Sequence, residues 1–253
     1  MVYNKRDFTN SVLGETMKLS IIVPVLNSHE IVRRNDLWYG RMNLPNTVEI
    51  LFIDDGSDPP IESPYVAHRT HDKREWTWAL ARNAGARIAK GSYLLMTDLD
   101  YIITKEAISD ALDFTGDYMG FKRQLGVLDE NGKFTQDRDT LISYGLPEER
   151  YDKKGCDLPP HPNNFVIRKD LFFDMGMYRE DRIGKPYPQR EDGAFKRTRH
   201  EWVRDGKLVE SEYRPMLYMF PNGRWCGDVD YNPFDLFHNL SRKSGHNPWQ
   251  LSA

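Results

Sequence analysis

Residues 92–101 read SYLLMTDLDY, an apolar run that stops at two aspartates. Two earlier segments have the same form: LSIIVPVLN at residues 19–27 and VEILFIDDGSDPP at residues 48–60. Continuous apolar runs of this length, ended by acids, Gly or Pro, are typical of buried strands that open into loops. We therefore expect three buried strands, each followed by a polar turn.

Helical patterns separate and follow these runs. Residues 28–43 carry apolar side chains near helical spacing after Ser28, a candidate N-cap, and residues 75–90 form a second such pattern closed by Gly91. Thr104 is a candidate cap for a third, shorter helix. Alternating strands and helices predict a parallel sheet with helices on its faces, whose ligand crevice lies at the carboxyl ends of the strands.

The second half of the chain is less regular. Its pattern indicates strands near residues 118–128, 163–169 and 214–220, a polar excursion over 136–154, a short helix over 170–178 and an amphipathic helix over 191–204. We expect a polar lead-in at residues 1–17 and one domain at 18–253. Within that domain, we expect a nucleotide-binding half at 18–116 and an acceptor half at 117–253.

Composition limits the possible partners. The 35 basic and 38 acidic side chains give a net charge of -3, so bulk electrostatics cannot hold a polyanion. Cys156 and Cys226 are the two cysteines, which excludes a cysteine zinc module and disfavours a disulfide framework. No apolar run is long enough for a membrane span, and the polar start lacks the core of a secretory signal. We expect a soluble, cytoplasmic protein.

The two acid-rich turns carry the first chemical signal. Asp98 and Asp100 are two residues apart after a strand, so both carboxylates can face one cleft and bind one hard divalent cation. The sequence DDGS at residues 54–57 offers carboxylates to a base N–H or a ribose hydroxyl. Taken alone, each motif also fits an ordinary turn. Neither GxGxxG nor GxxxxGK[ST] is present, which disfavours a dinucleotide dehydrogenase and a P-loop kinase.

Four blocks in order make a resemblance specific. They are LSIIVPVLN at 19–27, EILFIDDGSD at 49–58, ALARNAGARIAKGSYLLMTDLD at 79–100 and NNFVIRKDLFFDMGMYRED at 163–181. With them the chain resembles a family 2 glycosyltransferase of the GT-A fold. The resemblance implies a single α/β domain with a mostly parallel, Rossmann-like sheet flanked by helices and an irregular C-terminal acceptor half.

The resemblance also implies roles for particular residues. Pro24, Val25, Asn27, Asp54 and Asp55 match positions that frame the nucleoside of a nucleotide sugar, and Arg82 and Asn83 match a helix segment facing the donor. Asp98 and Asp100 match the metal-binding DXD motif, which bridges Mn²⁺ or Mg²⁺ to the diphosphate. Arg82 as a solvated helix charge and Asn83 as a surface amide are the structural alternatives.

A proton acceptor and a further metal ligand are implied in the second half. Asp192, supported by Glu191, matches the family's ED motif and is the candidate general base, which implies inversion at the anomeric carbon. The pair also suits the start of a helix, and Gly176-Met177 departs from the family's Gly-Gly. His238 matches a late metal ligand, with packing as its alternative; His161 and His246 have less support.

Our leading hypothesis is a metal-dependent, inverting glycosyltransferase that moves a sugar from a nucleotide sugar to a hydroxyl. We expect the donor to be a UDP sugar. The acceptor can be a glycan, a lipid, a protein or a modified nucleic acid. A sugar-phosphate nucleotidyltransferase is the alternative enzyme, although its glycine-rich basic loop is missing after the first strand. A catalytically degenerate protein that binds a nucleotide or glycan is the alternative outside enzymes.

Overall fold

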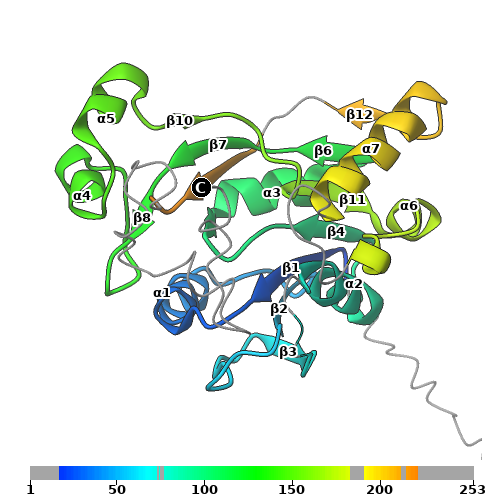
Figure 1. Cartoon of the computed structure of the whole chain (residues 1–253), viewed down its shortest axis with the longest axis horizontal. Helices are drawn as coiled ribbons and strands as arrows, with labels where there is room; N and C mark the ends of the chain where they lie inside the picture. The colour runs from blue at the N-terminus through cyan, green and yellow to red at the C-terminus, as the bar shows by residue number, and fades with distance from the viewer. Residues whose placement is uncertain (1–16, 73, 75–76, 183–190, 212–214, 222–253) are drawn as a thin grey trace, which may run out of the picture.

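A computed structural model describes residues 17–72, 74, 77–182, 191–211 and 215–221, and for residues 182, 191 and 192 the backbone alone. Its main sheet contains β1 (Leu19–Val25), β2 (Val48–Asp54), β3 (Val66–Arg69), β4 (Tyr93–Met96), β6 (Tyr118–Gly120), β11 (Phe165–Arg168) and β12 (Glu210–Ser211). In the described part of the chain these seven strands run in the order β12-β6-β11-β4-β1-β2-β3 (Figure 1).

The pairing of this sheet is mostly parallel, as the sequence predicts. β1 lies between β2 and β4 and is parallel to both, and the pairs β2–β3 and β6–β12 are also parallel. β11 is antiparallel to β4 and to β6. The reversed strand therefore brings the segment before residue 165 to the carboxyl end of β4, beside the predicted DXD motif.

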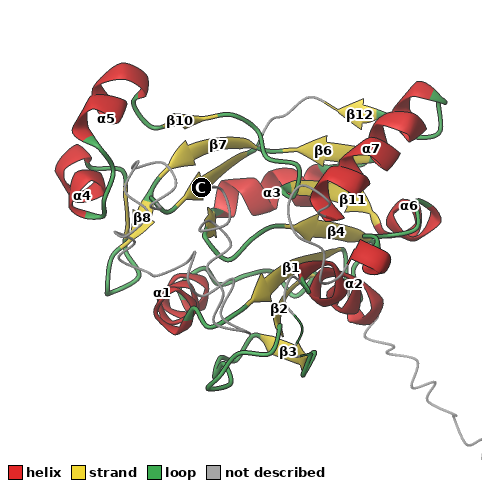
Figure 2. Ribbon diagram, in the orientation of Figure 1, coloured by secondary structure: helices red, strands yellow, loops and turns green. Residues whose placement is uncertain are grey.

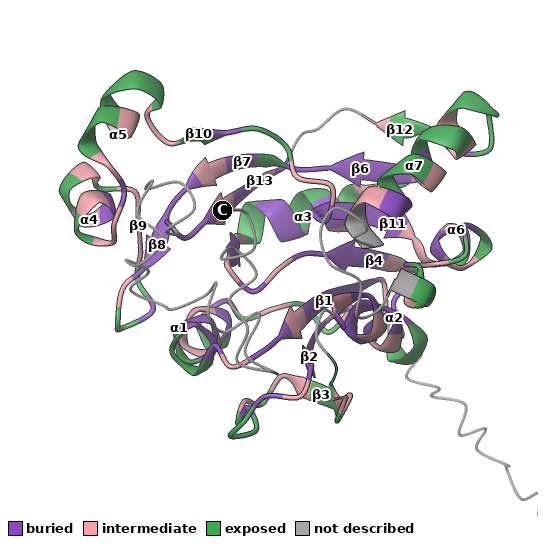
Figure 3. Cartoon of the chain, in the orientation of Figure 1, coloured by how far each residue is buried: buried purple, intermediate pink, exposed green. Residues whose placement is uncertain are grey.

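Helices cover both faces of the sheet (Figure 2). The helices α1 (His29–Gly40) and α3 (Lys105–Asp113) share one apolar cluster, and α2 (Trp78–Ile88), α6 (Lys169–Asp174) and α7 (Glu191–Arg204) share the other. Successive strand residues point to opposite faces, so Ile21 packs in the first cluster and Ile22 in the second. The strands β1, β2 and β4 are mostly buried on both sides, which explains their continuous apolar runs, while the edge strands β3 and β12 are partly exposed (Figure 3).

The predicted strands near residues 118–128 and 214–220 are confirmed, but the sequence pattern does not reveal several short elements that surround them. A smaller sheet has the order β10 (Asp157–Leu158), β7 (Lys122–Leu125), β13 (Met216–Met219) and β5 (Tyr101–Ile103). The remaining elements are the hairpin β8 (Val127–Leu128) and β9 (Phe134–Thr135), α4 (Arg138–Ser143), α5 (Glu148–Lys154) and the 3-10 turn η1 (Glu180–Arg182). The expected polar excursion over 136–154 therefore contains two short helices, which project at one end of the molecule in Figure 1.

Two helix starts test the capping predictions. The Oγ of Thr104 accepts the Ala107 N–H at 3.2 Å, which confirms Thr104 as the cap of α3. Ser28 occupies the N-cap position of α1 as predicted, but its hydroxyl donates to the carbonyl of Leu26 at 2.8 Å and does not cap the helix through its side chain. No helix in the described ranges has the length and apolarity needed to cross a bilayer. The division at residues 17 and 116 stays a prediction.

Candidate functional site

The carboxyl ends of three neighbouring strands meet at one edge of the main sheet. Because β1 is parallel to both β2 and β4, Asn27, Asp54–Asp55 and Asp98–Asp100 follow adjacent strand ends. The two acid-rich turns therefore lie where the sequence analysis expects the ligand crevice.

Asp98 is held by the helix on the sheet's second face. Its Oδ1 accepts a hydrogen bond from Nη2 of Arg82, a buried residue of α2. The Arg82 guanidinium carbon also lies 5.3 Å from the centre of the Tyr178 ring, within the range of a cation–π contact. The other Asp98 oxygen, Oδ2, lies 3.9 Å from Nδ1 of His161. The Asp98 side chain keeps 26% of its surface exposed and can still be reached from solvent.

Asp100 lies close enough to Asp98 for the two charges to interact. Burial and, next, the charge of Asp98 raise the pKa of Asp100 to about 7, while the Arg123 guanidinium opposes the rise. A buried carboxyl whose pKa is raised by a neighbouring carboxylate marks a favourable place for a cation, which neutralises the negative charge there.

The turn that carries the two aspartates is fixed from both sides. Nδ2 of Asn35, on α1, donates to the carbonyl of Leu99 at 3.3 Å. The N–H of Phe220, directly after β13, donates to the carbonyl of Asp100 at 2.9 Å. Both sheets and the first helix therefore position the Asp98–Asp100 turn before any ligand arrives.

The donor set fits a magnesium or manganese ion that is completed by a substrate. Carboxylate oxygens are the ligands these ions prefer. Among the described residues no three His, Cys, Asp or Glu side chains form a ready-made metal cage. His238, the predicted late ligand, lies outside the described residues.

Asp54 and Asp55 lie at the predicted edge, but their carboxylates are buried and bound within the chain. Asp54 accepts the N–H groups of Ser57 (2.9 Å) and Ile61 (3.1 Å) and an Arg69 guanidinium N–H (3.0 Å). The Asp55 oxygens accept hydroxyl hydrogen bonds, from Thr70 at 3.1 Å and Thr77 at 2.8 Å. In the structure these aspartates shape the loop after β2; a contact with a nucleoside stays a prediction.

The segment at the end of β1 locks onto the same loop. Asn27 has a positive φ of 51°, its N–H donates to the Ser57 hydroxyl (2.9 Å) and its Oδ1 accepts the Asp58 N–H (2.8 Å). Left-handed backbone is tolerated better by Asn than by most residues. Pro24 is partly buried and Val25 is buried in β1. The predicted nucleoside-framing residues thus come together as one joined pair of loops.

The structure assigns the two predicted α2 residues different surroundings. Arg82 is not a solvated helix charge, since it is buried against Asp98 and Tyr178. Asn83 is not a surface amide either: it is fully buried, its Oδ1 accepts the Tyr178 N–H (3.1 Å), and its Nδ2 donates to the Tyr178 carbonyl and to Glu180, both at 2.9 Å. The hydrogen bonds of Asn83 therefore hold residues 178–180 against α2. Contacts of Arg82 and Asn83 with the donor stay a prediction.

The helix that begins at Glu191 packs beside residues 178–180. Phe195, in the first turns of α7, stacks on Tyr178 with ring centres 4.7 Å apart and on Phe165 with ring centres 5.2 Å apart. Tyr178 thus contacts both Arg82 and α7, so the start of α7 lies on the Asp98 side of the sheet. The helix prediction for residues 191–204 is confirmed, while the side chains of Glu191 and Asp192 lie outside the described part.

The departure from Gly-Gly has a backbone explanation. Gly176 and Met177 both have positive φ angles, of 85° and 61°. The chain therefore keeps the left-handed backbone that a second glycine would favour, and places a methionine in it.

Of three residues close to the aspartates, sequence reasoning misses two, Arg123 and Tyr178, and gives His161 only as a weakly supported candidate. His161 faces Asp98, Arg123 donates to the Tyr101 hydroxyl and lies near Asp100, and Tyr178 joins α2 to α7. None has a regular spacing to the DXD motif. The signal that could have raised His161 is its place in the loop just before a strand, NNFVIRK, that pairs with the strand carrying the motif.

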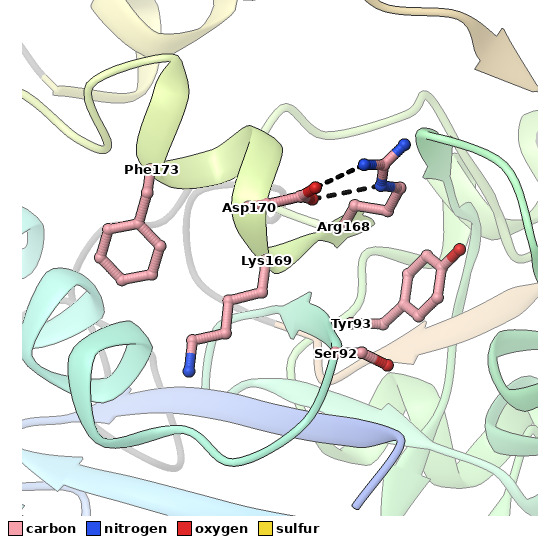
Figure 4. A pocket seen from close by; sticks show the side chains of 6 residues that line it. All are labelled: Ser92, Tyr93, Arg168, Lys169, Asp170 and Phe173. Atoms are coloured by element: carbon pink, nitrogen blue, oxygen red, sulfur yellow. Dashed lines mark hydrogen bonds and ion pairs between the residues drawn. The ribbon is translucent and has the colours of Figure 1, made fainter.

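A surface pocket of about 460 Å³ lies elsewhere, at the amino end of β4 (Figure 4). It is lined by Ser92, Tyr93, Arg168, Lys169, Asp170 and Phe173. Its charged groups have partners in the chain, since Arg168 is paired with Asp170 and Asp117, and the Lys169 ammonium donates to the Ala89 carbonyl. We therefore do not assign the donor site to it.

Comparison with known proteins agrees with the resemblance. Residues 20–119 match the family model described as Glycosyl transferase family 2. No curated protein matches the chain.

Several solved structures are similar to the chain. S. aureus TarS is 17% identical with a TM-score of 0.50, over 82% of this chain and 37% of TarS. A structure of S. aureus TarS 1–349 is 18% identical with a TM-score of 0.49, over 80% of this chain and 60% of that one. The mannosyltransferase PcManGT from Pyrobaculum calidifontis, in complex with GDP-Man and Mn²⁺, is 14% identical with a TM-score of 0.49, over 80% of this chain and 56% of that one. The chain thus spans less than two thirds of each neighbour. The likeness to TarS confirms the predicted fold.

Proposed function

We propose that the chain, whose residues 20–119 match the family model described as Glycosyl transferase family 2, moves a sugar from a nucleotide sugar to an acceptor hydroxyl with the help of a divalent cation. A glycosyltransferase is the enzyme class that the family match supports. The observation that carries the finer proposal is the Asp98–Asp100 turn, which presents two interacting carboxylates at the carboxyl end of β4.

Each part of the site has a task in this reaction. Asp98 and Asp100 would hold Mn²⁺ or Mg²⁺, which when bound supplies positive charge to the diphosphate leaving group. Arg82 holds Asp98 in place from behind through its Oδ1. The loops of Asn27 and Asp54–Asp55 frame the position we assign to the nucleoside.

The acceptor side requires a base. We assign this role to Asp192, with Glu191 supporting it, because α7 begins there and is anchored next to Arg82 through Tyr178 and Phe195. Asp192 takes the proton of the acceptor hydroxyl, and the oxygen of that hydroxyl forms a bond to the anomeric carbon. The bond from that carbon to the β-phosphate oxygen breaks, and the nucleoside diphosphate leaves with the electron pair. A single in-line displacement inverts the anomeric carbon.

The donor nucleotide is proposed to be UDP. One neighbouring TarS structure is described in complex with UDP-GlcNAc and the mannosyltransferase with GDP-Man, so a donor panel has to hold both nucleotides. A glycan, lipid, protein or modified nucleic acid remains the proposed range of hydroxyl acceptors.

The test is metal-dependent donor turnover by the full chain. UDP- and GDP-sugars are incubated with and without Mn²⁺ or Mg²⁺, and release of nucleoside diphosphate is measured. We expect turnover with metal, none with chelator, and loss in Asp100→Ala but not in the exposed helix control Asp110→Asn. Full turnover in chelator would refute the metal assignment.

The base and the alternatives need separate readouts. Asp192→Asn should keep donor binding and lose transfer by about 100-fold or more. Pyrophosphate release from a nucleoside triphosphate and a sugar phosphate would instead favour the nucleotidyltransferase. Tight UDP binding by calorimetry, with no turnover of any donor, would favour the degenerate binding protein.

A further inference from the structure

Arg123 is a buried cation that joins four segments of the chain. It lies in β7, and only 5% of its surface is exposed. Its Nε donates to the carbonyl of Pro159, in the loop between β10 and β11, at 2.5 Å. Its Nη1 donates to the hydroxyl of Tyr101 in β5 and lies 3.8 Å from the sulfur of Met219 in β13. Arg123 therefore ties three strands of the smaller sheet to the loop that precedes β11.

The segments that Arg123 contacts surround Asp100. Tyr101 follows Asp100 directly in the chain. The N–H of Phe220, the residue after Met219, donates to the carbonyl of Asp100 at 2.9 Å. Met219 is also the partner of Tyr101 in the antiparallel pairing of β13 with β5. Arg123 thus holds both the strand that leaves Asp100 and the strand whose end binds the Asp100 backbone.

The charge of Arg123 acts on the same aspartate. Arg82 forms an ion pair with Asp98, whereas the hydrogen bonds of Arg123 go to neutral groups. Burial and, next, the charge of Asp98 raise the pKa of Asp100, and the Arg123 guanidinium opposes this rise. Arg82 opposes it less than Arg123 does. Because a buried charge requires compensation, the two arginines balance the two aspartates, one from α2 and one from β7.

We propose that Arg123 is the positioning residue of Asp100 and holds it for the divalent cation as Arg82 holds Asp98. This inference rests on the proposed function and gives the smaller sheet a part in it. Arg123 acts through Tyr101 and the end of β13, and does not itself touch the cation. A planar guanidinium donates in fixed directions, which a lysine ammonium cannot reproduce. Losing an outer partner of this kind costs a metal site about 10- to 100-fold in affinity or activity.

The variants separate position from charge. Arg123→Lys keeps the positive charge but loses the two directed hydrogen bonds, and Tyr101→Phe removes only the hydroxyl that accepts from Nη1. Arg150→Lys is the matched control. Arg150, in α5, also donates to two backbone carbonyls, those of Gly155 (2.6 Å) and Asp157 (3.0 Å). Thermal melts establish that each variant is folded.

Binding of Mn²⁺ is measured without turnover. The full chain is titrated with Mn²⁺ in the presence of UDP, and in parallel of GDP, while the electron paramagnetic resonance signal of free Mn²⁺ is followed. The dissociation constant should rise about tenfold or more in Arg123→Lys. In Tyr101→Phe it should rise about two- to tenfold, the factor for one lost hydrogen bond. In Arg150→Lys it should not change.

Two results of this titration would overturn the proposal. One is a folded Arg123→Lys chain that binds Mn²⁺ as tightly as the parent chain. The other is an equal loss of affinity in Arg150→Lys, which would show a general effect of rigid arginines in this half. If Arg123→Lys does not fold, Tyr101→Phe decides, and an unchanged dissociation constant in that variant overturns the proposal.

A double-mutant cycle identifies the aspartate through which Arg123 acts. Arg123→Lys is combined with Asp100→Asn and, separately, with Asp98→Asn, and the Mn²⁺ titration is repeated. We expect the loss caused by Arg123→Lys to vanish in the Asp100→Asn chain, because the carboxylate that it positions is gone. The loss should persist in the Asp98→Asn chain. Equal losses in both backgrounds would mean that Arg123 only stabilises the fold, and would contradict a positioning role.

These outcomes are separable from failure of the proposed function. If the parent chain binds Mn²⁺ and turnover is metal-dependent but folded Arg123→Lys matches the parent, only this inference fails. If the parent chain binds no Mn²⁺ with either nucleotide, the metal-dependent transferase itself fails, and the positioning role of Arg123 fails with it.

Discussion

Asp98 shows how one side chain can be both fixed and available. One of its oxygens accepts from the buried guanidinium of Arg82, and the other faces His161. Arg82 in turn rests on the ring of Tyr178. A planar guanidinium held on both sides fixes the carboxylate in position without covering it, which is the role of a positioning residue.

This gives a prediction for Arg82. Arg82→Lys keeps the charge but loses the fork and the ring contact, and Arg82→Ala loses all three. We expect transfer to fall by about 10- to 100-fold and metal affinity to fall with it. Stability should drop by about 2 kcal/mol in Arg82→Ala, because a charged hydrogen bond is lost. Donor turnover, Mn²⁺ binding and urea unfolding measure the three effects.

Arg87→Ala is the matched control on the same helix. Arg87 is exposed and pairs with Glu180 at the surface, where an ion pair is worth little. Its removal should leave metal binding unchanged. Equal losses of metal affinity in the Arg82 and Arg87 variants would show a general effect of α2 and contradict the positioning role.

At the scale of single residues, the sequence locates the site but not the partners of each side chain. The types and order of Asp54, Asp55 and Asp98 predict which sheet edge they occupy. The carboxylates of Asp54 and Asp55 accept hydrogen bonds from Ile61, Arg69 and Thr77. These contacts depend on how the loop after β2 folds back, which no local sequence pattern encodes. The sequence also gives only weak support to His161, because its approach to Asp98 arises from the antiparallel pairing of β11 with β4.

At the scale of elements, period and capping predict the long segments and fail for the short ones. The apolar runs of β1, β2 and β4 are recovered because their burial is continuous, and the helix over 191–204 because its apolar residues recur at helical spacing. The strands β5 and β10 are three and two residues long, and their pairing with β13 and β7 joins residues about 33 to 118 positions apart. Such pairing is decided by tertiary contacts, which a single-sequence pattern does not contain.

The contact of α2 with the sheet gives a prediction at this scale. A Cβ at Gly85 would lie 2.5 Å from Cγ2 of Ile22 and 3.1 Å from Cγ1 of Ile53, both in central strands. Gly85→Ala gains about 1 kcal/mol of helix propensity. It also overpacks a rigid sheet, at a cost of up to about 3 kcal/mol. We expect a net loss of about 1–2 kcal/mol by urea unfolding.

Gly40→Ala provides the comparison. A Cβ there would meet no atom within 4 Å. This variant, at the last residue of α1, should match or slightly exceed the parent in stability. A Gly85→Ala chain as stable as the Gly40→Ala chain would show that α2 can move away from the sheet.

At the scale of the whole molecule, α1 joins the two halves of the chain. Buried Arg34 donates through Nη1 to the carbonyl of Leu128 (2.6 Å) and to the hydroxyl of Tyr144 (2.9 Å), both in the second half. Its Nε donates to Glu30 (2.8 Å), which also pairs with Arg33. Glu30 therefore neutralises the positive charge of Arg34, whose hydrogen bonds connect α1 to the second half of the chain.

This junction should weaken in acid. Hydrogen bonding to Arg33, and next to Arg34, lowers the pKa of Glu30 from 4.5 to about 2. A carboxyl whose pKa is lowered on folding adds stability above its unfolded pKa, and this stability is lost as the pH falls through the folded value. The window is therefore about pH 5 to 2. Because the Glu30 side chain is 47% exposed, we expect solvent screening to keep its contribution below about 1 kcal/mol.

The variant Glu30→Gln isolates the contribution of the Glu30 charge to the free energy of unfolding. At pH 7 it should be less stable than the parent chain by roughly 0.5–1 kcal/mol. The difference should shrink from pH 5 downward, because protonation removes the same charge in the parent. Urea unfolding at pH 7, 5 and 3 measures it, with Glu62→Gln on an exposed loop as the charge-matched control. A difference that stays constant from pH 7 to 3 would mean that Glu30 acts by packing and not by its charge on Arg34.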